Sequence, residues 1–410
     1  MKVFLCLAAM GVAAQACAAT VFGRQESLFT VNGRPTFLLG ISYYGGLGTS
    51  EEILRKDLDA FRQHGFNWIR VWATWSFRGT DVSAVDAAGR PRDPYMSRLV
   101  HLVRQCDRRG LIVDVTLTRG RFPTGGGIGD MAAHETAVRS IVAALKGFRN
   151  YYVDLANERD VRDARYVSVE ELRTLRELAR RSNPNLLVTA SFGGHDLGDE
   201  YVREALFRAD LDFVTPHRPR HRQSPSETER HTRECLAAMK RIGRVAPVHY
   251  QEPFRRGYTD WSPTAADFLT DLQGAIRGGA AGWCLHNGAT RGAPDERPWR
   301  SFDLRERALM DQLDTEETQV LRQAAGVVRE EWKPTVRRQR RPSPWPNRRV
   351  RCPLRSRQGL LRQIERCGAL CRTPRPQADR PAGPGGFPTR SLLAERCALA
   401  GSPRAGGTLL

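Results

Sequence analysis

The chain has 410 residues, 27% of them charged, and its formal net charge is +19. This length suits one large domain with appendages. The charge would suggest nucleic-acid binding, but residues 333–410 hold 18 Lys and Arg against 3 Asp and Glu and account for +15 of it. The nearly neutral remainder argues against a domain that binds nucleic acid specifically.

Residues 1–19 have the features of a signal peptide. Lys2 precedes an apolar run at 3–14 that is too short to span a membrane, and small residues follow at 16, 18 and 19. Cys17 suggests a lipoprotein signal, but Ala14 stands where such a signal needs a larger aliphatic residue. No later run reaches 18 apolar residues, so we expect a secreted or periplasmic protein without a transmembrane segment.

Eight strand–helix units follow a β lead-in at 21–35. The expected strands are 36–42, 66–71, 111–117, 151–156, 186–190, 211–215, 245–250 and 280–285. The first expected helix begins after the Ser50 cap, and the next ones cover 94–109, 131–145, 169–180, 200–207, 227–241 and 265–277. The segment 302–328 holds the last helix. Short apolar strands that alternate with helices predict a closed parallel sheet, a (β/α)8 TIM barrel spanning residues 20–332.

Two of these strands end in a glutamate. Residues 151–156 run into Asn157-Glu158, and residues 245–250 run into Gln251-Glu252, 94 positions later. With about 31 residues per unit, that interval is three units, which assigns the glutamates to strands 4 and 7. The longer loops, at 72–93, 118–130 and 216–226, also follow strands, as expected for the face that holds active sites. We expect Glu252 on the same face of its strand as Tyr250.

A pair of carboxylates at the mouth of a barrel can hydrolyse a glycosidic bond. One must be protonated to assist the leaving oxygen, and the other must be ionised to attack the anomeric carbon. Taken singly, Glu158 could equally begin a surface loop. Its combination with Glu252 on the expected strands favours the catalytic interpretation.

On these residues the sequence resembles the retaining glycoside hydrolases of the large (β/α)8 clan, the family 5-like enzymes that include cellulases and mannanases. The resemblance covers about residues 30–330. The matching residues are Asn157-Glu158, Glu252, Arg70 in Trp68-Ile69-Arg70, His217 and Trp283.

The resemblance implies a role for each residue. Glu158 would be the acid/base and Glu252 the nucleophile, and Arg70 would hold Glu252 ionised. Asn157 would bind the sugar 2-hydroxyl, and Trp283 would be the stacking floor of the cleaved sugar's subsite. No metal or organic cofactor is implied, the partner would be a β-glycan, and we expect a monomer.

Two departures from the family's pattern keep alternatives open. The third strand lacks the family's His, and His217-Arg218-Pro219 replaces the family's His-x-Tyr after strand 6. Tyr250 or Tyr43 would then have to supply the missing phenol. The departures also motivate a rival interpretation, a non-catalytic barrel that only binds glycans.

Several other residues have two interpretations. Trp72 and Trp75 after strand 2 are either hydrophobic cover for the barrel rim or sugar platforms. His286 either faces the cleft as a binding residue or caps a loop. His217 and His221 have metal-like spacing, but Pro219 between them breaks any helix, so we expect no metal site there.

Residues 333–410 are rich in Arg and Pro and lack any helical or strand period, which predicts disorder. A second hypothesis is that this tail is the product of a frameshift, since out-of-frame reading of a GC-rich gene gives such a composition; resequencing the gene tests it. A third hypothesis is that the basic tail makes the protein an adhesin for nucleic acid or for a cell surface. Cys106, Cys235 and Cys284 are too few and too widely spaced for a disulfide framework.

Overall fold

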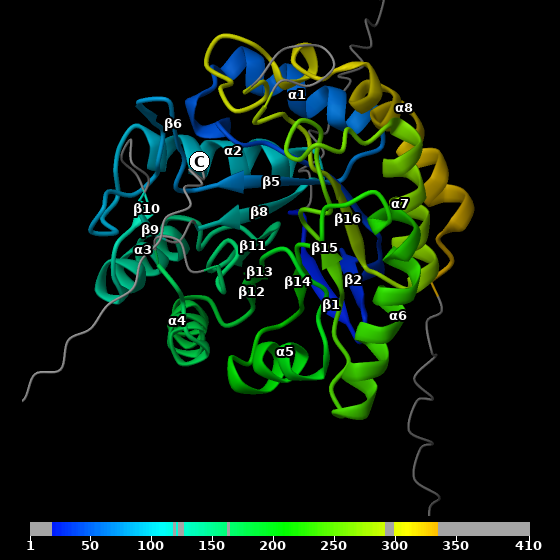
Figure 1. The fold of residues 1–410 in the computed structure, drawn as a ribbon. Coiled ribbons are helices and arrows are strands. Elements are labelled where there is room, and N and C mark those ends of the chain that lie inside the picture. Colours follow the sequence, from blue (N-terminus) through cyan, green and yellow to red (C-terminus); the bar gives the residue numbers. More distant parts are fainter. Residues whose placement is uncertain (1–18, 118–119, 122–126, 162–164, 292–298, 335–410) are drawn as a thin grey trace, which may run out of the picture. The chain divides into compact units, whose positions relative to one another are not determined.

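The computed structural model describes residues 19–117, 120–121, 127–161, 165–291 and 299–334 (Figure 1). The predicted leader up to residue 18 and the predicted tail from residue 335 lie outside these ranges. Within them, no helix combines the length and the apolar character needed to cross a membrane.

Seven parallel strands form one curled sheet in the order β12-β11-β8-β5-β4-β16-β15 (Figure 1). Their bounds are Leu187–Thr189 (β12), Tyr151–Asp154 (β11), Ile112–Thr116 (β8), Trp68–Trp72 (β5), Leu38–Ser42 (β4), Gly282–Leu285 (β16) and His249–Tyr250 (β15). The eighth strand of the barrel, β14 (Thr215–Pro216), closes the sheet. It pairs with β13 (Ser191–Phe192) on one side, and Val214 just before it forms a β-bridge with Val248 on the other. The predicted (β/α)8 barrel is confirmed.

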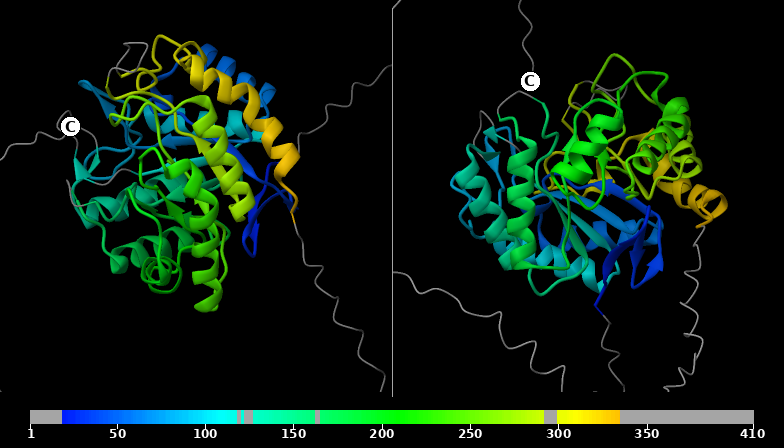
Figure 2. Two further views of the ribbon diagram at one scale, coloured as in Figure 1. Left: turned by 45° about the vertical axis from the view of Figure 1, so that its right-hand side comes forward. Right: turned by 90° about the horizontal axis from the view of Figure 1, so that it is seen from below.

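The helices surround the sheet, and α6, α7 and α8 pack side by side (Figures 1 and 2). Their bounds are Glu51–Gln63 (α1), Tyr95–Arg108 (α2), Met131–Ala144 (α3), Val169–Ser182 (α4), Asp199–Arg203 (α5), Ser224–Arg241 (α6), Ala265–Gly278 (α7) and Thr315–Glu331 (α8). A π-helical turn, Glu204–Arg208, continues α5, and short 3-10 turns cover Gly46–Gly48 and Leu309–Asp311.

Side-chain caps set several helix boundaries. Ser50 caps α1 as predicted, and its side chain accepts a hydrogen bond from the Ile53 backbone N–H. As predicted, the last helix begins within the segment 302–328. Asp314 and Glu317 form a capping box, so α8 begins only at Thr315.

Side chains alternate between the inside of the barrel and the helix layer along each strand. Inside, the Trp68 ring lies directly over Gly40 of the neighbouring strand. A Cβ at Gly40 would come 1.6 Å from a carbon of that ring, so only glycine fits there. Cys106, Cys235 and Cys284 are all buried and free, so they form no disulfide framework, as their number and spacing predicted.

An N-terminal hairpin closes the end of the barrel at which the strands begin. It consists of β1 (Phe22–Gln25), β2 (Leu28–Val31) and β3 (Arg34–Pro35). Phe29 packs edge-on against Phe213 and His249, with ring centroids 5.0 and 5.4 Å apart. Access to the barrel interior is therefore from the other end, where the strands finish. The short hairpins β6–β7 (Ser76–Phe77, Thr80–Asp81) and β9–β10 (Gly120–Arg121, Gly127–Ile128) belong to loops that follow β5 and β8.

Candidate active site

Arg70, on β5, is fully buried and contacts acidic groups from three other strands. Its NH2 atom lies 3.1 Å from Asp154 Oδ2, and its Nε lies 3.2 Å from Asp114 Oδ2. It also donates hydrogen bonds to Glu252 Oε1 and, at 2.9 Å, to Asn157 Oδ1. Burial raises the pKa of Asp114 to about 8 against the opposing charge of Arg70. Among these acidic groups, Glu252 contributes most to raising the pKa of Arg70.

Glu252 lies two residues beyond β15 and is only 5% exposed. Its Oε2 accepts a hydrogen bond from Arg220 NH2 at 2.8 Å and lies 3.2 Å from His286 Nε2. Burial raises the pKa of Glu252, but His217, His286 and Arg70 outweigh that effect and hold it well below its usual value. Glu252 is thus ionised, as an attacking carboxylate must be.

Glu158 lies beyond the end of β11 with a φ of +49°, a region that residues other than glycine rarely adopt. Its backbone N–H donates to Ser191 Oγ at 2.9 Å. Gly193 lies against its side chain, where a Cβ would come within 3.1 Å of the Glu158 Cβ. Strained backbone that is held by its surroundings is typical of functional sites.

The two glutamates come together at the open end of the barrel. One oxygen of each and a ring nitrogen of His217 all lie within 4.8 Å of one another. Arg220, in the loop after β14, bridges the pair: its NH2 is 2.8 Å from Glu252 Oε2 and 3.6 Å from Glu158 Oε1. Burial raises the pKa of Glu158, but the hydrogen bond and charge of His217, together with Arg220, lower it to about 2. Both carboxylates are therefore ionised in this state.

Glu158, His217 and Glu252 have the residue types and spacing of a metal site. Arg70 and Arg220, however, both contact Glu252 and place two positive charges beside it. A cation bound to these carboxylates would be repelled by both guanidinium groups. The donor set fits acid–base and nucleophilic chemistry better than metal binding. His221 pairs with Glu227 instead and does not join His217.

An aromatic cluster forms one wall beside the carboxylates. Tyr44 stacks on Trp72, with ring centroids 4.5 Å apart, and its hydroxyl lies 3.0 Å from His286 Nδ1. Trp72 is only 2% exposed, which agrees with its interpretation as rim cover. Trp75 is half-buried, donates its Nε1–H to Phe302 O at 3.0 Å and stays a candidate platform. His286 faces Glu252 rather than capping a loop.

Three sequence-based predictions are wrong because the side chains point away from the barrel interior. Tyr43, Tyr250 and Trp283 are at most 1% exposed, and each bonds to a surrounding helix. Their partners are Asp57 on α1 at 3.0 Å, Thr232 on α6 at 2.6 Å and Asp271 on α7 at 2.6 Å, respectively. Trp283 is therefore no sugar platform, and neither tyrosine supplies a phenol to the site. Glu252 does not share the outward face of Tyr250, because the strand ends before it.

Sequence reasoning missed Tyr44, Arg220 and also Arg255, which donates a hydrogen bond to the Tyr44 hydroxyl at 3.2 Å. Strand alternation could have indicated Tyr44: Ser42 faces inward, so two residues further on the chain faces inward again. Arg220 and Arg255 lie in loops, where no period relates sequence position to direction.

We expect Trp283→Phe to lower the free energy of unfolding by about 1–3 kcal/mol, because it leaves the buried Asp271 without its indole donor. The KM for substrate should stay unchanged, since the ring does not face the site. Denaturant titration and steady-state kinetics check both parts. A KM that rises several-fold with unchanged stability would restore the sugar-platform role.

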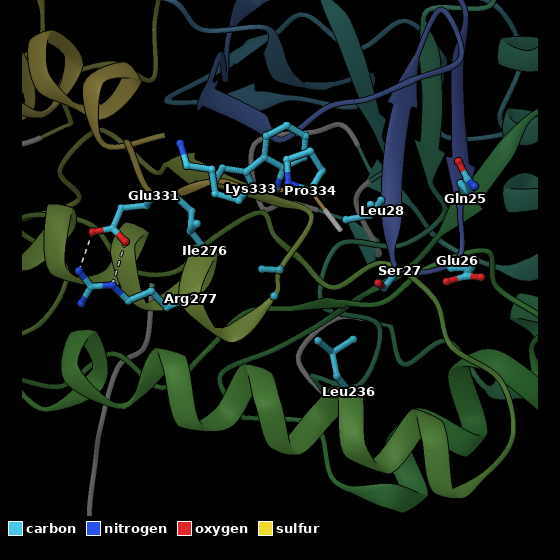
Figure 3. Close-up of a pocket in the computed structure, with 13 residues that line it drawn as sticks. Gln25, Glu26, Ser27, Leu28, Leu236, Ile276, Arg277, Glu331, Lys333 and Pro334 are labelled. Atoms are coloured by element: carbon cyan, nitrogen blue, oxygen red, sulfur yellow. Dashed lines mark hydrogen bonds and ion pairs between the residues drawn. The ribbon is translucent and has the colours of Figure 1, made fainter. Parts of the chain in front are cut away.

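A cavity of about 360 Å³ lies elsewhere, between the β1–β2 hairpin and the C-terminal ends of α7 and α8 (Figure 3). Arg277 and Glu331 form an ion pair at its edge, with a shortest N–O distance of 2.6 Å. The cavity contains neither catalytic candidate. It lies at the hairpin end of the barrel and does not change the assignment of the site.

No protein-family model matches the sequence, and neither does any curated protein. Solved structures do match. They include a glycoside hydrolase family 5 protein from Bacteroides vulgatus ATCC 8482, with a TM-score of 0.55 and 15% identity over 74% of this chain and 69% of that one. A family 5 mannosidase from Rhizomucor miehei matches with a TM-score of 0.53 and 13% identity, over 77% of this chain and 98% of that one. An exo-β-1,4-mannosidase from Opitutaceae bacterium strain TAV5 matches with a TM-score of 0.53 and 17% identity, over 76% of this chain and 63% of that one.

These likenesses show the fold. The predicted structural resemblance to family 5 glycoside hydrolases is thereby confirmed for the barrel, at identities too low to carry activity. The roles of individual residues rest on the geometry of the site itself.

Proposed function

We propose that this protein is a retaining glycosidase that cleaves β-linked glycans. The observation that carries the proposal is the approach of Glu158 and Glu252, whose oxygens lie within 4.8 Å at the open end of the barrel. Carboxyl groups about 5–5.5 Å apart suit double displacement, whereas inverting enzymes need a wider gap to admit a water molecule. The structural likeness to glycoside hydrolases supports the same reaction class.

In this mechanism Glu252 attacks the anomeric carbon while Glu158 gives a proton to the leaving oxygen. A covalent glycosyl-enzyme forms, and the leaving group departs as an alcohol. Glu158, now a carboxylate, then takes a proton from water, whose oxygen displaces Glu252 and releases the sugar. Arg70 and His286 keep Glu252 ionised and oriented for both steps.

Glu158 has to gain a proton before the first step. The contacts of His217 and Arg220 keep it ionised in the ligand-free state. Substrate binding between the carboxylates must therefore displace Arg220 and break the contact between His217 and Glu158. The loss of both contacts raises the pKa of Glu158 toward the range of a general acid.

The experiment is a substrate panel of β-mannans, β-glucans, β-xylans and aryl β-glycosides, treated with the full-length protein. We expect release of reducing sugar, and NMR should detect the β-anomer as the first product. Glu158→Gln should lower kcat on polysaccharides by about 100–10,000-fold, the usual contribution of a general acid. The exposed Glu330→Gln on α8 is the matched control and should retain full activity. An α-anomer as first product would contradict retention.

A non-catalytic glycan-binding barrel is the second candidate function. It is favoured by the position of Arg220, which occupies the space between two ionised carboxylates. Saturable glycan binding without release of reducing sugar from any member of the panel would support it over hydrolysis.

Export through the leader at residues 1–19 and a monomeric state are also part of the proposal. N-terminal sequencing of the exported protein and its mass in solution test them.

A further inference from the structure

Arg255, three residues beyond Glu252, is a cation surrounded by aromatic rings. Its guanidinium carbon lies 5.8, 5.1 and 5.4 Å from the ring centroids of Tyr44, Tyr258 and Phe302. It donates one hydrogen bond, to the Tyr44 hydroxyl at 3.2 Å. In the part of the chain that the structure describes, no carboxylate lies within ion-pair distance of Arg255.

Arg220 contacts the Tyr258 ring, which Arg255 also contacts. Its guanidinium carbon lies 4.6 Å from the centroid of Tyr258, whose side chain is 39% exposed at the rim. Unlike Arg255, Arg220 is paired, but its partners are the two catalytic candidates Glu252 and Glu158. The reacting bond has to lie between those carboxylates, so Arg220 must leave them when substrate binds.

Once substrate has entered, two guanidinium groups therefore line the mouth without an anionic partner among the described residues. The Nε atoms of Arg220 and Arg255 are buried without a hydrogen-bond partner among the described residues. Asn287, directly after His286, is fully buried, and neither its side-chain oxygen nor its nitrogen has a partner in the same set. Buried donors without partners are costly unless a ligand or water satisfies them.

On the basis of the proposed function, we propose that the glycan cleaved here is anionic. The sugar bound beside Glu158 and Glu252 carries a carboxylate or a sulfate ester, which pairs with Arg255 and draws Arg220 away from the two glutamates. A guanidinium group matches both anions because it donates two parallel hydrogen bonds. A neutral sugar offers Arg220 no replacement for the carboxylates that it leaves.

This exchange of partners links substrate recognition to catalysis. When the substrate anion draws Arg220 away from Glu158, one of the two neighbours that lower the pKa of Glu158 is removed. Only the contact with His217 then remains to be broken before the proton needed for the leaving oxygen can bind. A neutral sugar offers Arg220 no new partner, so its binding displaces Arg220 from the glutamates less favourably. Sites built to pair with one polar group discriminate strongly against analogues that lack it.

The test compares matched substrates on the full-length protein. The small-molecule set is 4-nitrophenyl β-glucuronide, the 6-sulfate of 4-nitrophenyl β-glucoside, and the unmodified β-glucoside. The polymer set is a β-linked uronate-containing polysaccharide and the same polymer after chemical reduction of its carboxyl groups. We expect kcat/KM at least about 10-fold higher for an anionic member than for its neutral match, and the uronate and sulfate arms identify the anion.

Arg255→Met should lower this preference at least 10-fold, and Arg255→Lys, which keeps the charge, should retain most of it. Arg104→Met, at an exposed position on α2, is the matched control and should leave every rate unchanged. The basic tail is present in all variants, so its attraction for anionic polymers cancels in the comparison.

The outcomes separate this inference from the proposed function. Equal kcat/KM on anionic and neutral substrates, or a preference that survives Arg255→Met, overturns the inference and leaves the glycosidase standing. If nothing is hydrolysed, calorimetry with the anionic and reduced oligosaccharides decides. If the anionic oligosaccharide binds at least 10-fold more tightly than the reduced one, and Arg255→Met removes this difference, the anionic site is supported in a protein that only binds glycans. Equal affinity for the two oligosaccharides overturns the inference.

Discussion

Glu252→Ala is expected to abolish hydrolysis, with kcat falling at least about 10,000-fold, because the variant has no atom that can form the glycosyl-enzyme. Arg70 and Arg220 would then face a cavity with no carboxylate in it. A small anion such as azide should enter that positively charged space and attack the anomeric carbon. The measurement is the rate on an aryl β-glycoside cleaved by the wild type, with and without azide, and we expect an α-glycosyl azide as product.

Glu158→Ala provides the matched comparison. The loss of activity in this variant should depend on the leaving group. It should be large for a polysaccharide and small for an activated aryl glycoside, whose aryl group departs without a proton. Azide should give the β-glycosyl azide in this variant, because it replaces water in the second step. If Glu252→Ala retains activity, or the two variants give the same azide anomer, the assignment of the two roles fails.

Arg70→Met is expected to destabilise the fold by about 3–5 kcal/mol or more at neutral pH, because it leaves buried carboxylates without their counter-ion. Arg70 is fully buried and contacts Asp114, Asp154 and Glu252 at once. Denaturant titration of the full-length protein measures the loss. Arg104→Met, which removes an exposed arginine, should change the free energy of unfolding by less than about 0.5 kcal/mol.

The loss of folding stability caused by Arg70→Met should depend on pH. The pKa of Glu252 is held well below its usual value in the folded wild type. A carboxyl with a depressed folded pKa stabilises the protein above its unfolded pKa, about 4.3, and that contribution disappears as the pH falls through the folded pKa. The stability gap between wild type and variant should therefore be widest near pH 7 and narrow below about pH 4. A gap that stays constant across this range would contradict the charge argument.

The sequence determined the parts of this protein that depend on local patterns. Short apolar strands alternating with amphipathic helices predicted the barrel and the order of its elements. Ser50 marked the start of α1, because a cap acts on the backbone of its own first turn. The interval between Glu158 and Glu252 assigned them to strands 4 and 7, since parallel strands all end on one face.

The capping box at Asp314 was also visible in the sequence, as Asp-x-x-Glu, and it sets the start of α8 within the expected segment 302–328. The apolar residues before the box pack against other elements: Leu309 is fully buried, and its backbone N–H bonds to Asp57 on α1 at 2.9 Å. The local signal thus decides where the helix begins, and a tertiary contact 252 positions away holds the segment before it.

Only the tertiary structure decided which side chains reach the candidate active site. A one-residue difference separates Tyr44, which faces the site, from Tyr43, which packs against α1. Where a strand gives way to a loop, alternation stops, and the direction of Glu252 and Arg220 depends on contacts between segments distant in sequence. Charge compensation across those contacts is a property of the folded barrel, because it requires groups from several strands within about 4 Å of one another.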